Sequence, residues 1–329
     1  MTAQPLKTES WKPFSSLFKI LALTMAISLD APLVDAQTSP IGVIGGNIQK
    51  RASGVLAMMG YTLTPDVTTG SISISDGDSG NPQITMISLG GGAMISKSVP
   101  LYLEGTASFS RYDPTFAATG GVEDRRLPAK WNSVSGTAGI GWDFPLVQDI
   151  VLRPIFNFSL GHVESDLSIA GRVIGNRFDK DLKFLDNGRL NAAGVGGSLM
   201  LDYERYRPEG EIDVELRYTN IYLQSIYETS EAAEGSSDVQ NLSLYTRWRA
   251  PTVLTALDRP LRYVLEFAHT QFLGDLRGAL GFDWLSSLGA GLELDSSAYD
   301  VIVTRTRLLG RYQFGEGVHG WSISLAVSF

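Results

Sequence analysis

The sequence predicts an all-β fold, a transmembrane antiparallel β-barrel of about twelve strands. Three observations predict it. Apolar and polar residues alternate with a period of two from about residue 67 onward. The last nine residues form an especially regular alternating run, and the N-terminus has the pattern of an export signal. No later window is long and apolar enough for a membrane helix, so an exported chain of this kind would cross a membrane with strands.

The alternation is clearest in the last nine residues. Every odd position is large and apolar, and every even position is Ser or Ala. Such a strand can face lipid on one side and a lumen on the other, and its length suits a tilted transmembrane strand. We predict that its apolar face is a barrel-insertion signal, formed by Trp321, Ile323, Leu325, Val327 and Phe329.

The same pattern recurs along the chain in runs that exceed the usual length of soluble strands. With the C-terminus on the periplasmic side, the short connections fall on that side and the long polar ones, such as 114–130 and 164–188, fall outside, as in bacterial barrels. The predicted strands are 67–76, 83–96, 101–113, 131–144, 149–163, 189–205, 211–227, 238–250, 261–273, 284–294, 300–314 and 320–329.

Aromatic residues near the strand ends predict two interfacial girdles. At the periplasmic side these are Trp142, Phe144, Tyr206, Trp248, Tyr263 and Phe329. At the outer side they are Tyr112, Tyr227, Phe272, Trp284, Tyr312 and Trp321.

The N-terminus predicts a secretory signal peptide over residues 1–36. Lys7, Lys12 and Lys19 precede an apolar run of about ten residues, and small residues at Val34 and Ala36 suit a cleavage site. The run is too short to span a bilayer as a helix. Export without a helical anchor, followed by barrel strands, predicts location in the outer membrane, with membrane lipid as a partner.

Composition excludes several classes of function. The formal net charge is −8, and residues 1–36 are balanced, so the acidic excess lies in the predicted barrel. No cluster of Lys and Arg is present, which argues against nucleic acid as a partner. The chain has no Cys, so it forms no disulfide and no thiolate metal site. Nothing in the sequence indicates a cofactor or an oligomeric state.

Charged residues stand on the face opposite the apolar one in many strands, which predicts a wet, charged lumen. Both signs occur, so the lumen could be a small selective pore, or its charges could pair into a sealed structural network. The candidate lumen-lining residues are Glu104, Arg153, Asp202, Glu204, Asp213, Glu215, Arg217, Arg247, Arg249, Arg262, Glu266, Arg305 and Arg307.

Several segments resemble a known family. The C-terminal run is similar to the signal that outer-membrane barrels present to the barrel-assembly machinery, which the resemblance implies as a partner. Leu89-Gly-Gly-Gly-Ala93, Pro100-Leu-Tyr-Leu-Glu-Gly105 with Ser110-Arg-Tyr-Asp-Pro114, and Gly139-Ile-Gly-Trp-Asp-Phe144 resemble the β-domains of autotransporters, over residues 67–329. The likeness is to the solitary kind that lacks a passenger.

Secreting members of that family carry a long passenger between signal and barrel, whereas here only residues 37–66 stand in that place. This departure puts secretion activity in doubt. In autotransporter-like barrels such a segment threads the lumen, so residues 41–60 could form a short helical plug. Gly45, Gly46 and Gly54 disfavour a helix, and a periplasmic linker or an extra strand is at least as good an interpretation.

No catalytic or metal-binding constellation stands out, and we predict no enzyme activity. The alternative is a barrel hydrolase, a lipase or protease with a His-based site at the outer rim, for which His162 and His269 are the candidates and His319 a weaker one. A soluble periplasmic β-protein is a third possibility. Asp76-Gly-Asp78-Ser-Gly-Asn81 matches part of a calcium loop but lacks its terminal Glu, so a polar turn is preferred.

Overall fold

A computed structural model of the chain describes residues 59–60, 70–75, 83–96, 98–113, 131–165, 189–227, 229, 235–277, 282–298 and 303–328. The predicted signal peptide, most of the linker, Phe329 and most residues of the long loops lie outside these ranges. The described residues belong to one compact unit within Ile41–Phe329. Among them, no helix is long and apolar enough to span a bilayer.

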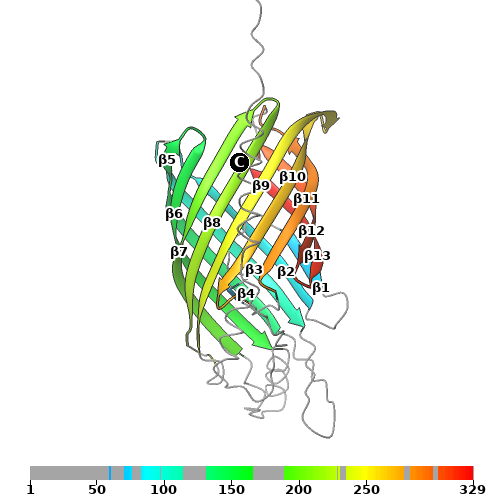
Figure 1. Ribbon diagram of the computed structural model, residues 1–329. Coiled ribbons are helices and arrows are strands. Elements are labelled where there is room, and N and C mark those ends of the chain that lie inside the picture. The colour runs from blue at the N-terminus through cyan, green and yellow to red at the C-terminus, as the bar shows by residue number, and fades with distance from the viewer. Residues whose placement is uncertain are drawn as a thin grey trace, which may run out of the picture. The chain divides into compact units, whose positions relative to one another are not determined.

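The described residues form a closed antiparallel barrel (Figure 1). Strands β1 to β4 pair in sequence order, as do strands β5 to β13. β13 also pairs with β1, and the pairing of β4 with β6 closes the ring. The strands are β1 (Gly70–Ser75), β2 (Gln83–Met94), β3 (Leu101–Asp113), β4 (Trp131–Trp142), β5 (Phe144–Val147), β6 (Ile150–Ser165), β7 (Arg189–Arg207), β8 (Gly210–Ser225), β9 (Ser236–Ala256), β10 (Arg259–Gly274), β11 (Trp284–Asp295), β12 (Arg305–Gly315) and β13 (His319–Ser328).

The predicted fold class is confirmed. Strands β4 and β5 both pair with β6, so they are two parts of one interrupted strand, and the described barrel has twelve positions around its wall. An even number of antiparallel strands is usual for bacterial single-chain membrane barrels. Closure removes the sheet edges, so the backbone groups of the wall are paired within the barrel, which a hydrocarbon environment requires.

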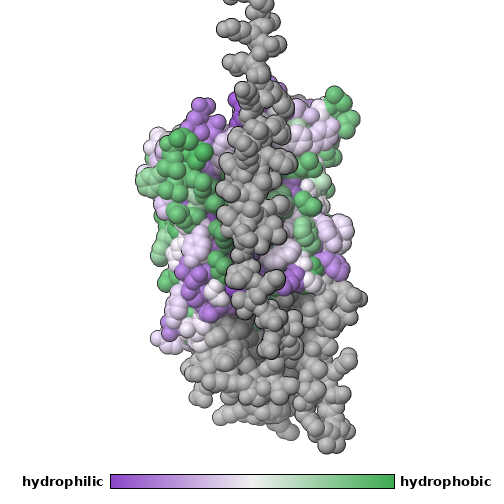
Figure 2. Space-filling model, viewed as in Figure 1, coloured by the Kyte–Doolittle hydropathy of each residue, from purple (hydrophilic) through white to green (hydrophobic). Residues whose placement is uncertain are grey.

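Burial follows the alternation in the sequence. Along β6, Phe156, Phe158 and Leu160 are exposed on the outer wall, whereas Asn157 and Ser159 between them are fully buried. Figure 2 shows apolar residues across the outer wall where the described strands are visible. A soluble protein would bury its apolar face, so this inverted arrangement identifies a barrel that faces lipid.

The two ends of the barrel differ. At one end, which we call the short-turn end, β7 joins β8 and β9 joins β10 through tight turns. Leu257 and Asp258 both have positive φ (51° and 59°), as a two-residue type I′ hairpin turn requires. At the opposite end, which we call the long-loop end, β3 and β6 end and β4 and β7 begin. Residues 114–130 and 166–188, which join these strands in the sequence, lie outside the described residues. This is the asymmetry expected from the sequence.

Apart from shifts of one or two residues at other described strand ends, three predicted strands differ from the structure. The strand predicted at 131–144 is interrupted at Asp143, whose backbone N–H bonds to the carbonyl oxygen of Pro100. The strand predicted at 300–314 begins at Arg305, which pairs with Ser328, because the neighbouring strand ends there.

The third error concerns β9, which was predicted to end at residue 250 but continues to Ala256. The predicted strand limits leave 251–260 as a turn, and this segment has a proline at each end. However, β8 pairs with β9 only as far as Glu211, opposite Arg249. Beyond that point β9 has an unpaired edge, where a proline is tolerated because no backbone donor is needed. The β9–β10 hairpin therefore extends past its neighbour on the β8 side.

The glycines of β2 show how small residues make room on the inner wall. A side chain at Gly92 would collide with the ring of Tyr102, which is buried and lies under the guanidinium of Arg153, 4.0 Å from the ring centroid. A side chain at Gly91 would meet nothing within 4 Å. Gly92 thus leaves space for the Tyr102 ring in the lumen, whereas Gly91 does not serve this purpose.

We therefore expect Gly92→Ala to lower the free energy of unfolding by about 1–3 kcal/mol, because the rigid ring of Tyr102 must move. Gly91→Ala is the matched control and should be close to neutral. Urea unfolding of the refolded barrel in detergent micelles measures both. Equal effects of the two substitutions would contradict this account of the inner wall.

Candidate functional site: the lumen

The structure places most of the predicted lumen residues on the buried inner wall. Arg247 and Arg305 are slightly more accessible, Glu215 is half-buried, and Glu204 is exposed near the short-turn end. The buried members of the predicted set are Glu104 by its side chain, Arg153, Asp202, Asp213, Arg217, Arg249, Arg262, Glu266 and Arg307.

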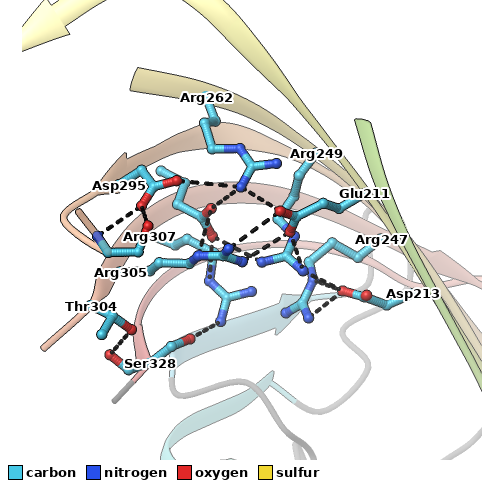
Figure 3. Close-up of polar contacts among 12 residues, drawn as sticks. Glu211, Asp213, Arg247, Arg249, Arg262, Asp295, Thr304, Arg305, Arg307 and Ser328 are labelled. Atoms are coloured by element: carbon cyan, nitrogen blue, oxygen red, sulfur yellow. Dashed lines mark hydrogen bonds and ion pairs between the residues drawn. The ribbon is translucent and has the colours of Figure 1, made fainter. Parts of the chain in front are cut away.

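The largest group of charges lies inside the short-turn end and is drawn in Figure 3. We call it the short-turn cluster. Its members come from strands β8 to β12, and each arginine lies within 4.0 Å of at least one carboxylate. It consists of Arg247, Arg249, Arg262, Arg305, Arg307, Glu211, Asp213, Glu293 and Asp295.

Glu211 is the hub of this cluster. Its carboxylate accepts hydrogen bonds from Arg262 at 2.7 Å and from Arg305 at 2.9 Å, and Arg249 lies 2.9 Å away. Arg305 belongs to β12, four strand positions from β8 around the ring. This contact therefore runs across the lumen rather than along the wall.

A second contact crosses the lumen nearer its middle. Arg217 of β8 binds Glu104 of β3 through two hydrogen bonds, 2.8 Å to Oε2 and 2.6 Å to Oε1. Asn157 donates to the same carboxylate, and Ser198 accepts from Arg217. This is a two-point arginine–carboxylate pair whose remaining groups are also bonded, the strongest form of buried ion pair.

These contacts limit the width of the lumen. A circular barrel of twelve strands about 4.8 Å apart, tilted by about 40°, has a diameter of about 24 Å and separates strands four positions apart by about 21 Å. An arginine and a glutamate in contact span at most about 15 Å between their Cα atoms. The barrel is therefore flattened at both levels, and side chains bridge the space.

Further pairs line the wall between these levels. Arg311 donates to Glu266, to which Tyr245 also donates at 2.6 Å. Arg153 bonds Asp143 through two nitrogens and lies 3.1 Å from Asp202. The inner wall thus holds its charges in pairs and small networks.

Five partners of these pairs were missing from the predicted set. They could have been found from the alternation within each strand, because residues two apart face the same side of the wall. Glu211 lies two residues from Asp213, so both face the same side of the wall. Arg311 likewise lies an even number of residues from Arg305 and Arg307. The missing residues are Asp143, Glu211, Glu293, Asp295 and Arg311.

Toward the long-loop end the inner wall becomes apolar. Phe272 of β10 was predicted in the outer aromatic girdle, which is wrong: it is buried and packs edge-to-face on Phe282, with ring centroids 5.7 Å apart. It lies an even number of residues from Arg262 and Glu266 in the same strand, so it points inward as they do. The other buried apolar residues at this level are Val163, Leu190, Ala192, Ile221, Leu223, Val239 and Leu276.

Met59 and Gly60 contact this apolar layer. A side chain placed at Gly161 of β6 would overlap Met59, and one at Gly60 would overlap Val239 of β9. Met59 is almost completely buried. These two residues belong to the segment for which a plug, a linker and an extra strand were considered, and its other residues lie outside the described ranges.

The predicted insertion signal lies on the outer wall. Trp321, Ile323, Leu325 and Val327 are all exposed on β13, whereas Ser322 and Ser324 between them are buried. The ring of Tyr312 contacts that of Trp321 in a tilted arrangement, with centroids 4.8 Å apart, near the long-loop end. Phe329 lies outside the described residues.

The histidines do not form a catalytic triad in the described part of the chain. His162 contacts Asn191 at 2.6 Å and Glu164 at 3.6 Å, whereas His269 contacts Ser286 at 2.8 Å. The hydroxyl and the carboxylate thus belong to different histidines, and His319 is exposed. The described residues contain no cluster of metal-ligating side chains. The segment 76–81, which resembles a calcium loop, lies outside them.

Solved structures similar to this chain include autotransporter β-domains. The β-domain of the Bordetella autotransporter BrkA matches with a TM-score of 0.43 at 12% identity, over 80% of this chain and 100% of that chain. The transport unit of AIDA-I from Escherichia coli matches with a TM-score of 0.44 at 11% identity, over 86% and 100%.

The translocator domain of NalP from Neisseria meningitidis matches with a TM-score of 0.38 at 14% identity, over 94% of this chain and 99% of that chain. The likeness to autotransporter β-domains predicted from the sequence is thus found among the solved structures. No protein-family model and no curated protein matches the chain.

Proposed function

We propose that this chain is an integral outer-membrane β-barrel without a passenger, and that its lumen is closed by ion pairs, so that it serves as a structural barrel rather than an open pore. The observation that carries the proposal is the Arg217–Glu104 pair, which joins strands four positions apart across the lumen. The Arg305–Glu211 pair repeats this closure nearer the short-turn end.

The proposal includes the route to the membrane. Residues 1–36 direct export and are removed, and the apolar face of β13 is presented to the barrel-assembly machinery. The exposed row of Trp321, Ile323, Leu325 and Val327 supports this role, since it offers a continuous apolar surface on the last strand. The short-turn end would then face the periplasm and the long loops the exterior.

Fractionation of expressing cells tests the location. We expect the protein in the outer-membrane fraction, with an N-terminus at residue 37, and a band that migrates differently on a gel before and after boiling. The shift is expected because a closed barrel keeps its fold in detergent until it is heated. A protein found in the periplasmic fraction with no such shift would refute the proposal.

A further inference from the structure

The ion-pair contacts of the short-turn cluster join five arginines to four carboxylates. Glu215, a further carboxylate of the inner wall, interacts with Arg247 without an ion-pair contact. A buried arginine donor that none of these carboxylates satisfies favours an additional negative group.

Arg307 is the member with the poorest partners. Its side chain is 8% exposed, yet Nε and Nη1 have no hydrogen-bond partner. Its Nη2 donates to the Ser328 hydroxyl at 3.3 Å, and its closest carboxylate contact is 3.4 Å from Nε to Glu293. Buried guanidinium donors normally make hydrogen bonds, because leaving one unsatisfied costs about 1–3 kcal/mol.

A second guanidinium borders the same space. Figure 3 shows the guanidinium groups of Arg307 and Arg247 beside one another below the rest of the cluster, and the two like charges repel each other. Arg247 uses Nε and Nη2 for a single oxygen of Asp213, at 2.7 and 2.5 Å. Among the described side chains drawn in Figure 3, none accepts a hydrogen bond from Nη1 of Arg247.

The carboxylates of the cluster do not neutralise the charges of Arg247 and Arg307. Asp213 and Glu293 each keep one oxygen without a hydrogen bond. However, Asp213 already lies within 4.0 Å of two arginines and Glu293 of four. Their negative charge is shared among cations, so it cannot also neutralise the Arg247–Arg307 pair.

We propose that Arg307 and Arg247 form an oxyanion-binding site in the lumen, which takes the carboxylate or phosphate group of a small acidic solute from the short-turn side. A guanidinium binds such a group through charge-assisted hydrogen bonds. Nη1 of Arg307 has no hydrogen-bond partner and can donate one, and the guanidinium of Arg247 lies beside it. Arg305, at 21% side-chain exposure, marks the accessible side of the cluster.

Calorimetric titration of the full-length mature barrel tests the site. The barrel is refolded in a sugar-based detergent that contains no phosphate and titrated with inorganic phosphate or succinate, with chloride adjusted to constant ionic strength. We expect saturable binding near one equivalent of either anion. Arg307→Met should weaken it by about 10-fold or more, because charge-assisted hydrogen bonds are lost. Arg207→Met, at the exposed end of β7, is the control with the same charge change and should bind as wild type.

Arg307→Lys is a second variant that keeps the positive charge and a hydrogen-bond donor, and it should bind the anion more weakly than wild type but more tightly than Arg307→Met. The unboiled gel band confirms that each variant is a folded barrel. Addition of phospholipid distinguishes a lipid phosphate from a free solute: the site as proposed keeps its affinity for succinate when lipid is present. No saturable binding to the wild type, or equal binding by wild type and both Arg307 variants, would overturn the proposal.

Discussion

Glu104→Gln is expected to destabilise the barrel by about 3–5 kcal/mol, because it leaves the buried charge of Arg217 without its partner. The substitution conserves size and shape, so cavity formation does not contribute. Arg217 would retain its hydrogen bond to Ser198 but lose the ionised acceptor of its two strongest bonds. Urea unfolding of the barrel in micelles, followed by tryptophan fluorescence, measures the change.

Two variants test the cause of this loss. Glu204→Gln, the same substitution at an exposed site, should change stability by no more than about 0.5 kcal/mol. Glu104→Gln combined with Arg217→Met should recover more than half of the stability lost by Glu104→Gln alone, because removing both charges abolishes the unpaired one. A double variant as unstable as the single one would show that the ion pair is not the cause.

Leu199→Arg is expected to destabilise the inserted barrel by about 2–4 kcal/mol, the cost of a cation at the middle of a lipid-facing wall. Leu199 lies near the centre of β7 and is exposed on the outer wall. In water this leucine would be an ordinary surface residue and the change would cost little. Reversible unfolding in phospholipid vesicles measures the difference.

Leu257→Arg is the matched control, since Leu257 is exposed in the turn at the tip of the β9–β10 hairpin. We expect it to be close to neutral because the tip extends beyond the neighbouring strand. If the two substitutions had equal costs in vesicles, the assignment of the outer wall to lipid would be wrong.

The wall of the barrel could be predicted from the sequence because the alternation of apolar and polar residues within one strand shows which of them face outward and which inward. In β6 the period of two alone separates Phe156 and Phe158, which are exposed on the outer wall, from Arg153 and Asn157, which are buried on the inner wall. The error at Phe272 arose where position near a strand end was used in place of parity. The missing Arg311 and Glu211 share the parity of predicted lumen residues and were within reach of the same rule.

The contacts across the lumen could not be predicted in this way. Arg217 and Glu104 are 113 residues apart, and their meeting depends on strand register, tilt and the flattening of the barrel. None of these is a local property of the sequence. Likewise, the extension of β9 beyond Ala250 depends on where its neighbour β8 begins, which prolines at 251 and 260 do not reveal.

Single-channel recording of the full-length mature protein in a planar lipid bilayer tests most directly whether ion pairs close the lumen. Insertion is first confirmed by the unboiled gel band from the same preparation. We predict a bilayer that shows no stable open-channel current at moderate voltage, because the Arg217–Glu104 and Arg305–Glu211 pairs bridge the flattened lumen. A steady ohmic current with uniform steps from the wild-type protein would contradict this account.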